Sequence, residues 1–155
     1  KSLQNLSQEI ALEIKQAQTD AIVGKNSSLF DPDPPIYGVH FDISKNNQFL
    51  FFADTSQFPI GSYDEDINEE FFDGLDHTVK ISRGNIKELC VYDGNNIEDC
   101  LVSNLDVAFK RPFPDAIISS NSSGVLNPIS AKIRIEQREQ TRTIEVSSLG
   151  QITVK

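Results

Sequence analysis

The first stretch of the chain carries an apolar residue at every third or fourth position, which is the spacing of one face of an α-helix. Polar and charged residues fill the positions between them from Ser2 to about Val23. Gly24 follows directly and is suited to end a helix as its C-cap. The pattern therefore predicts one amphipathic helix over residues 2–23, whose apolar stripe consists of Leu3, Leu6, Ile10, Ile14, Ala17 and Ala21.

After a proline-containing loop at 25–35, the chain consists of short runs of β-branched and aromatic residues separated by polar turns. The first two runs, 36–43 and 48–54, are joined by a short polar loop and predict a strand pair. A Ser/Asn-rich loop at 119–128 separates the earlier strands from the last hairpin. The further predicted strands are 78–82, 86–92, 97–103, 106–110, 130–137, 141–147 and 151–154.

One helix followed only by strands is an α+β order, which favours an antiparallel β meander or small sandwich. Helices do not alternate with strands, so a doubly wound nucleotide-binding sheet is excluded. At 155 residues the chain is long enough for one core. We divide it into a helical part, 1–24, and a globular antiparallel β domain, 25–155. Methionine is absent even at position 1, so we expect that an N-terminal part has been removed.

Charge is spread unevenly along the chain, and its overall balance limits the partners. A net charge of −9 argues against nucleic acid, whose phosphates are bound mainly by Lys and Arg. Residues 31–99 hold 15 acids and four bases, whereas 110–155 hold four acids and seven bases. The asymmetry either forms a solvated acidic face or gives the molecule opposite-signed faces that favour head-to-tail packing of copies.

The two cysteines of the chain, Cys90 and Cys100, flank a short turn-forming segment. An Asp-Gly pair between two short apolar runs, here Asp93 and Gly94, is a strong signal for a β-hairpin. A turn at this point brings the two sulfurs nearly opposite each other, within reach of a disulfide. We therefore predict a disulfide and folding outside the reducing cytosol. Two buried free thiols are the alternative, and two cysteines without a neighbouring histidine pair do not make a zinc set.

Catalytic chemistry has few candidates in this sequence. Histidine is the usual general base at neutral pH, and only His40 and His77 are present. Neither lies near a serine or cysteine in a recognisable nucleophile motif, and the chain has no phosphate-binding glycine loop, H-E-x-x-H or C-x-x-C sequence. We therefore predict that the protein is not an enzyme. A small hydrolase whose site is assembled in space from one of these histidines is the alternative.

One acidic segment is the best candidate for a cation site, because it alternates oxygen-bearing side chains as a calcium loop does. Its four candidate ligands are Asp64, Asp66, Asn68 and Glu70. Two positions depart from the calcium-loop pattern: Glu69 replaces the turn glycine, and Leu75 replaces the bidentate glutamate. We therefore expect an acidic loop without metal and no cofactor, with a calcium ion as the alternative.

Four segments of the chain are similar to type IV pilin-like proteins. The opening helix resembles the soluble half of a pilin helix without its apolar half. Residues 37–41 followed by 49–54 are similar to the first hairpin of many such proteins, and 143–154 resemble their closing strand, glycine turn and short strand. The segment 109–114 is similar to the end of a strand in predicted prepilin-type proteins. The chain therefore resembles minor pilins, in particular the H-type minor pseudopilins of type II secretion systems.

This resemblance implies a structural subunit that works by assembly. In such proteins an apolar N-terminal helix anchors the subunit in the inner membrane and then packs with its copies in a filament. Here it implies other pilin or pseudopilin subunits as partners, and a cell-envelope location that changes from inner membrane to periplasmic or extracellular filament. The helix residues expected to divide between domain packing and filament core are Leu3, Leu6, Ile10 and Ile14.

A second class of function is a secreted or periplasmic β-rich module that captures a ligand without catalysis. Its site would be the acidic loop or a face of the sheet. The sequence upstream of Lys1 separates the two classes. A glycine followed by about 20 apolar residues is expected for a pilin-like subunit, whereas a short signal peptide with a small-residue cleavage site is expected for a binding module.

Overall fold

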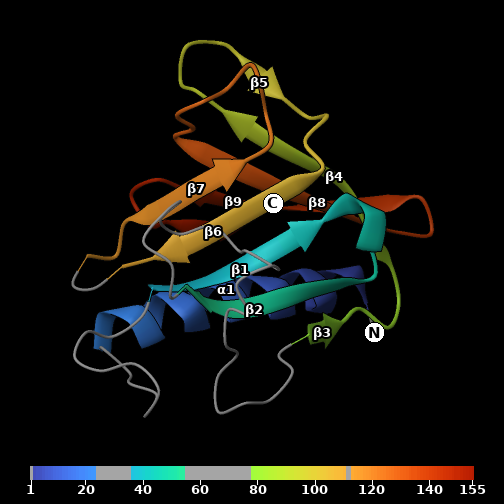
Figure 1. Ribbon diagram of the computed structural model, residues 1–155. Helices are drawn as coiled ribbons and strands as arrows, with labels where there is room; N and C mark the ends of the chain where they lie inside the picture. Colours follow the sequence, from blue (N-terminus) through green and yellow to red (C-terminus); the bar gives the residue numbers. More distant parts are fainter. Residues whose placement is uncertain (1, 24–35, 55–77, 111–112) are drawn as a thin grey trace.

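The computed structural model describes residues 2–23, 36–54, 78–110 and 113–155. In these ranges one helix lies alongside two layers of β-strands (Figure 1). The elements are α1 (Leu3–Val23), β1 (Ile36–Asp42), the short 3₁₀ helix η1 (Ile43–Lys45), β2 (Gln48–Asp54), β3 (Thr78–Lys80), β4 (Asn85–Tyr92), β5 (Glu98–Asp99), β6 (Asn104–Phe109), β7 (Ala116–Ser120), β8 (Ser130–Gln137), β9 (Gln140–Ser147) and β10 (Ile152–Val154).

Helix α1 confirms the helix predicted from the apolar spacing. The Ser2 hydroxyl oxygen accepts a hydrogen bond from the Asn5 N–H at 3.2 Å and caps the first turn. Every residue of the predicted stripe is buried, with exposed fractions between 0 and 7%. The stripe therefore packs against the protein's own strands along the whole helix. The C-cap predicted at Gly24 lies outside the described residues.

Each of the two sheets has five strands, and every pairing between described strands is antiparallel. The first sheet has the order β3-β2-β1-β6-β7, and the second has the order β10-β9-β8-β4-β5. The α+β class is therefore confirmed. Strands β1, β2 and β3 follow one another as a meander in the first sheet, and β8, β9 and β10 do so in the second. After β3 the chain enters the second sheet with β4, returns to the first with β6, and ends in the second, so the strands form two packed layers.

Most predicted strands are present within a few residues of their predicted bounds. The strand predicted at 97–103 is much shorter, because β5 contains only Glu98 and Asp99. Strand β7 was not predicted, and the expected loop at 119–128 overlaps its end. It is a five-residue edge strand with two serines, and its pairing with β6, from Phe109↔Ala116 to Leu105↔Ser120, defines it. Such a short segment carries little strand signal of its own.

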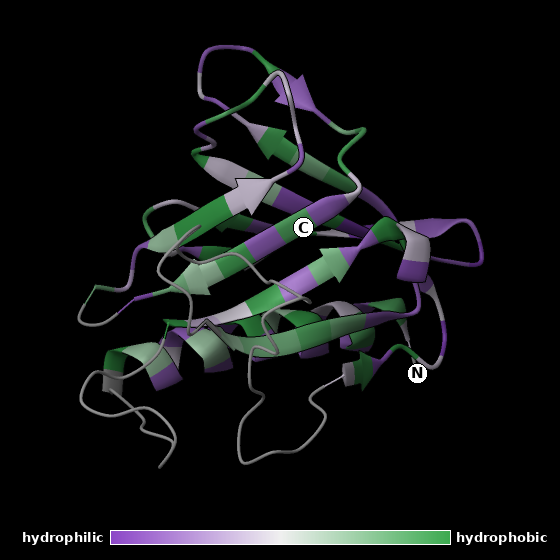
Figure 2. Cartoon of the chain, in the orientation of Figure 1, coloured by the Kyte–Doolittle hydropathy of each residue, from purple (hydrophilic) through white to green (hydrophobic). Residues whose placement is uncertain are grey.

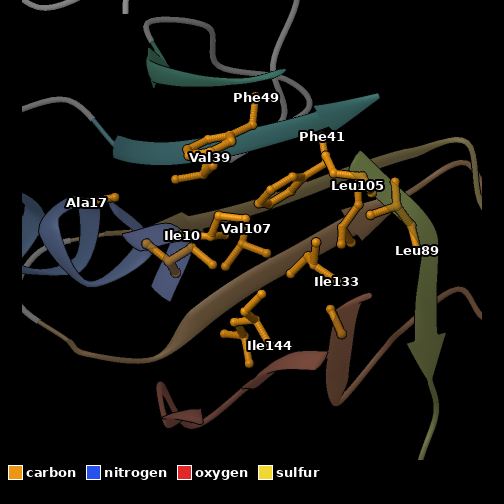
Figure 3. Packing of buried hydrophobic residues seen from close by; sticks show 14 of the residues in the cluster. Ile10, Ala17, Val39, Phe41, Phe49, Leu89, Leu105, Val107, Ile133 and Ile144 are labelled. Carbon is orange, nitrogen blue, oxygen red and sulfur yellow. The ribbon is translucent and has the colours of Figure 1, made fainter. Parts of the chain in front are cut away.

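The helix and both sheets share one hydrophobic core (Figure 3). Strands β1 and β6 contribute Phe41 and Val107 from the first sheet, and Ile133 and Ile144 face them from the second. Ile10 enters the same core from the helix. Colouring by hydropathy shows green segments on the inner strands and purple segments at the outer loops (Figure 2). The helix therefore belongs to the same packed unit as the strands.

The turn between β9 and β10 ties the second sheet to the helix. Gly150 in this turn has a φ of +91°, a conformation that side chains rarely adopt. A Cβ at Gly150 would lie 2.2 Å from the Pro114 carbonyl oxygen. The Gln18 side-chain amide donates hydrogen bonds to that oxygen at 2.8 Å and to the Gly150 oxygen at 3.0 Å. The turn therefore needs glycine for both its backbone conformation and its close contact with the chain at Pro114.

We expect Gly150→Ala to lower the free energy of unfolding by about 2 kcal/mol, because the new methyl group clashes with a backbone oxygen and the positive φ becomes strained. Denaturant unfolding monitored by circular dichroism measures this change. The matched control is Gly124→Ala, since a Cβ at Gly124 meets nothing within 4 Å. Equal stability of the two variants would show that the turn can shift away from Pro114.

Candidate functional site

A histidine and an aspartate lie side by side on the outer face of the first sheet. His40 in β1 is directly opposite Asp106 in β6, and its Nδ1 lies 2.5 Å from the Asp106 Oδ1. Their neighbours in sequence, such as Phe41 and Leu105, point into the core. Strand alternation therefore directs His40 and Asp106 outward. Their side chains are only 14% and 11% exposed, so the pair is largely shielded from water.

This pair lies in a pocket of about 260 Å³ at one end of the first sheet. The Asp42 carboxylate, which also lines it, accepts hydrogen bonds from the Ser44 N–H and hydroxyl and so caps η1. The pocket offers an imidazole, two carboxylates, one ammonium group and two side-chain amides. Such a lining can hold a small polar ligand and exchange a proton with it. The full set of lining residues is His40, Asp42, Lys45, Gln48, Phe49, Leu50, Asn104 and Asp106.

The arrangement around His40 differs from that of a nucleophilic triad. In a triad the histidine lies between the carboxylate and the nucleophile. Here Asp106 lies between His40 and Ser119, which is opposite Asp106 on β7. The hydroxyl of Ser119 is thus two strands away from His40, a distance of about 10 Å. Neither cysteine can serve as nucleophile, because the protein has no free thiol. The other candidate base, His77, lies outside the described residues.

The predicted disulfide between Cys90 and Cys100 is present. Val91 pairs with Asp99, so the two cysteines are opposite each other at the next position of the β4–β5 ladder, with a Cα separation of 4.0 Å. Glu88 brings a carboxylate oxygen within 4.8 Å of both sulfurs. These three residues do not form a metal site in this state, because metal binding requires thiolates and the sulfurs are bonded to each other.

Two ion pairs flank the disulfide on the outer face of the second sheet. The Arg134 guanidinium lies 2.7 Å from the Glu88 carboxylate, and the Lys132 ammonium lies 3.0 Å from the Glu98 carboxylate. All four side chains are about a third exposed. Each pair therefore contributes little to stability, since exposed ion pairs are typically worth less than about 1 kcal/mol. Their main effect is to fix the positions of the side chains around the disulfide.

The hydroxyl of Ser122 joins the loop before β8 to strand β5. It donates a hydrogen bond to Asp99 at 2.6 Å, and the Leu101 N–H donates to the same carboxylate at 2.9 Å. The Ser122 hydroxyl, which has the larger effect, and the Leu101 N–H together hold the pKa of Asp99 below its ordinary value of 3.8. A carboxylate with a lowered pKa stabilises the folded state above its unfolded pKa. That contribution is lost as the pH falls through the folded pKa.

We expect Ser122→Ala to raise the pKa of Asp99 toward 3.8, because its strongest donor is lost while the Leu101 N–H remains. The carboxyl titration followed by NMR measures this shift. The variant also loses part of the difference in stability between pH 7 and pH 2 that the wild type shows. Asp115→Asn is the control for general charge effects. An unchanged Asp99 titration in Ser122→Ala would mean that this hydroxyl does not set the pKa.

The helix residues expected to contribute to assembly are all inside the domain. Leu3, Leu6, Ile10 and Ile14 have exposed fractions of 7%, 5%, 1% and 0%. The large apolar side chains that α1 exposes are Leu12 at 62% and Ile22 at 40%. Leu12 borders a groove of about 430 Å³ between the helix and β10. Any contact of this part of the helix with another subunit therefore involves its outer side.

The candidate calcium ligands Asp64, Asp66, Asn68 and Glu70 lie outside the described residues, so an acidic loop without metal stays the prediction there and calcium binding its alternative. The partnership of His40 with Asp106 was not predicted from the sequence. Its only local signal is an acidic residue between the apolar residues Leu105 and Val107.

No helix within the described ranges is both long enough and apolar enough to span a bilayer. Comparisons of the chain with protein-family models, with curated proteins and with solved structures found no significant match.

Proposed function

We propose that this chain is the folded domain of a pilin-like structural subunit, a minor pilin or pseudopilin of a type IV pilus or type II secretion filament. The observation that carries the proposal is the helix α1, which precedes all strands and is fixed to them along its whole length. Its 21 residues span about 32 Å. A helix held in this way can transmit the position of an N-terminal anchor to the domain as one rigid body.

The contacts of α1 support this role. The helix packs against β1 and β6 of the first sheet and against β8, β9 and β10 of the second. Gln18 also clamps the closing glycine turn, part of the segment that resembles the end of pilin-like proteins. Removal or rotation of the helix would therefore open both sheets. In a filament, a subunit built in this way would keep its domain in a fixed orientation relative to the filament core.

The native gene provides the first test. We expect it to encode a glycine followed by about 20 apolar residues that continue without interruption into Leu3. In cells that express the tagged full-length protein, we expect it in the membrane fraction and in filaments sheared from the surface. A strain without the prepilin peptidase is the control, and the protein should then remain uncleaved. A short signal peptide in place of the apolar segment would contradict the proposal.

A ligand-binding module is the second candidate, and the pocket around His40 and Asp106 favours it. Two carboxylates in one pocket, of which Asp106 is largely shielded from water, suit an amine or guanidinium group. Binding of putrescine or arginine can be followed by NMR shifts of β1 and β6 amides. The expected result for a binding module is saturable shifts that Asp106→Asn abolishes and Asp115→Asn preserves, with no shifts from acetate. Absence of saturable shifts from either amine would remove this candidate.

A further inference from the structure

The described part of the chain exposes eight large apolar side chains, and most of them gather in two places. Four lie next to β5 or on the loop before β8, which hydrogen bonds to Asp99 and Tyr92 hold against the β4–β5 hairpin. We call this group the apolar tip: Ile97, Leu101, Leu126 and Ile129. Three others lie on the segments that Gln18 joins at the β9–β10 turn, and we call them the turn patch: Ile22, Phe113 and Leu149. Only Leu12 belongs to neither group. Clustered exposed apolar residues are typical of interaction surfaces.

The apolar tip is held in place by covalent and hydrogen bonds. The disulfide fixes the β4–β5 hairpin, and the bond from Ser122 to Asp99 joins the loop at 121–129 to it. The Ile129 N–H donates to the Tyr92 oxygen at 2.8 Å, which attaches the far end of that loop. Leu101 is 94% exposed and Leu126 is 78% exposed on this rigid support. A surface ordered before binding loses little conformational entropy when a partner docks.

Acidic groups surround the apolar tip. Asp93, Glu98 and Asp99 lie on the same hairpin, and Lys132, which pairs with Glu98, is the base that the structure places against them. Asp93 accepts hydrogen bonds from the N–H groups of Asn95 and Ile97 and is therefore fixed beside the apolar side chains. The tip thus combines an apolar centre with a negative border.

The turn patch has the opposite charge at its border. Phe113 is next to Pro114 and Leu149 is next to Gly150, and Gln18 bonds to both of these loops. Ile22 lies one turn beyond Gln18 on the helix. Two lysines lie near this patch. Lys15 lies one helical turn before Gln18, and the Lys110 carbonyl oxygen accepts a hydrogen bond from the Phe113 N–H. Asp115 is the exposed acid beside Phe113 and Pro114, so among the described residues two bases and one acid border this patch.

We infer that the apolar tip of one copy docks on the turn patch of a second copy. Both surfaces are apolar at the centre, and their borders carry opposite charges, so a contact between unlike patches is favoured over a contact between like ones. Such a heterologous contact leaves one free patch on each end of a pair and allows growth into a chain of subunits. The biological role of this contact rests on the proposed function, because the contact would join the folded domains of neighbouring filament subunits.

The contact can be measured on the isolated chain. Sedimentation equilibrium over increasing protein concentration should show a rising average mass for the wild type. A tip variant, Leu101→Ser with Leu126→Ser, and a patch variant, Phe113→Ser with Leu149→Ser, should each associate at least about tenfold more weakly. Leu12→Ser is the matched control, since Leu12 is 62% exposed outside both patches and should associate as the wild type does. Circular dichroism checks that all variants are folded.

A mixture of the two variants gives the decisive result. The tip variant keeps an intact turn patch and the patch variant keeps an intact tip, so the mixture should form pairs that do not grow further. If instead one of the two variants alone associates as the wild type does, the contact joins like patches and the inference is wrong; a mixture that stays monomeric while the wild type associates overturns it too. A wild type that is monomeric at every concentration also overturns it. Neither result affects the test of the native gene, so the proposed function fails or stands separately.

Discussion

Replacing Ile14 with alanine is expected to lower the free energy of unfolding by about 3 kcal/mol. Ile14 has no exposed surface and lies in the middle of the helix stripe, between the two sheets. The substitution removes three buried side-chain carbon atoms with their packing contacts. It leaves a cavity that the surrounding strands cannot fill completely. In a domain of this size, such a loss corresponds to a fall in Tm of roughly 10 °C. Denaturant unfolding and calorimetry both measure it.

The matched control is Leu12→Ala on the same helix. Leu12 is 62% exposed, so its truncation should change stability by less than about 0.5 kcal/mol. A large gap between the two variants assigns the stripe to the core of this domain and places Leu12 outside that core. Similar small effects for both would mean that the helix is not docked on the sheets in solution, and the proposed rigid connection would fail with it.

The helix could be predicted because its apolar residues keep one spacing over 21 residues. The same pattern could not show what covers the stripe. The resemblance led us to expect that Leu3, Leu6, Ile10 and Ile14 divide between two faces. In the structure both sheets contact the helix, and together they bury all four residues. A stripe of this width is compatible with either arrangement until the partners of the helix are known.

The candidate sites show the same limit. Cys90 and Cys100 are close in sequence on either side of an Asp-Gly turn, so local hairpin geometry was enough to predict their bond. His40 and Asp106 are 66 residues apart, and their contact depends on the pairing of β1 with β6. Alternation predicts that each side chain points outward from its strand. It does not specify which strands become neighbours, or in which register.

The turn between β8 and β9 was located correctly from the strand patterns on either side, although its own residues are not typical of a hairpin turn. The strands extend to Gln137 and from Gln140, so only Arg138 and Glu139 form the turn. Both have positive φ values, 50° and 68°, where two-residue hairpin turns usually have Asn and Gly. The pairing of eight residues along each strand compensates for this unfavourable pair. Long-range pairing therefore determines a turn that the residue types alone do not favour.

Removing the disulfide, by Cys90→Ala together with Cys100→Ala, is expected to lower the free energy of unfolding by about 3 kcal/mol. The bond joins two cysteines that are ten residues apart in sequence. Without it, the unfolded chain gains conformational entropy. Strand β5 has only two residues, Glu98 and Asp99, to hold it on β4. We therefore expect the loss of order to be local as well as global. Amide hydrogen exchange should accelerate first at 93–103.

Reduction of the wild-type protein is the matched experiment, because it opens the same bond without changing a residue. The reduced wild type and the double variant should lose similar stability, and both should keep the exchange protection of β8 and β9. Thiol titration of the unfolded, unreduced protein must find no free thiol; two free thiols would contradict the bond itself. Since β5 supports Ile97 and Leu101 of the apolar tip, both forms should also associate more weakly than the oxidised protein. Unchanged association would show that the apolar tip does not depend on the disulfide.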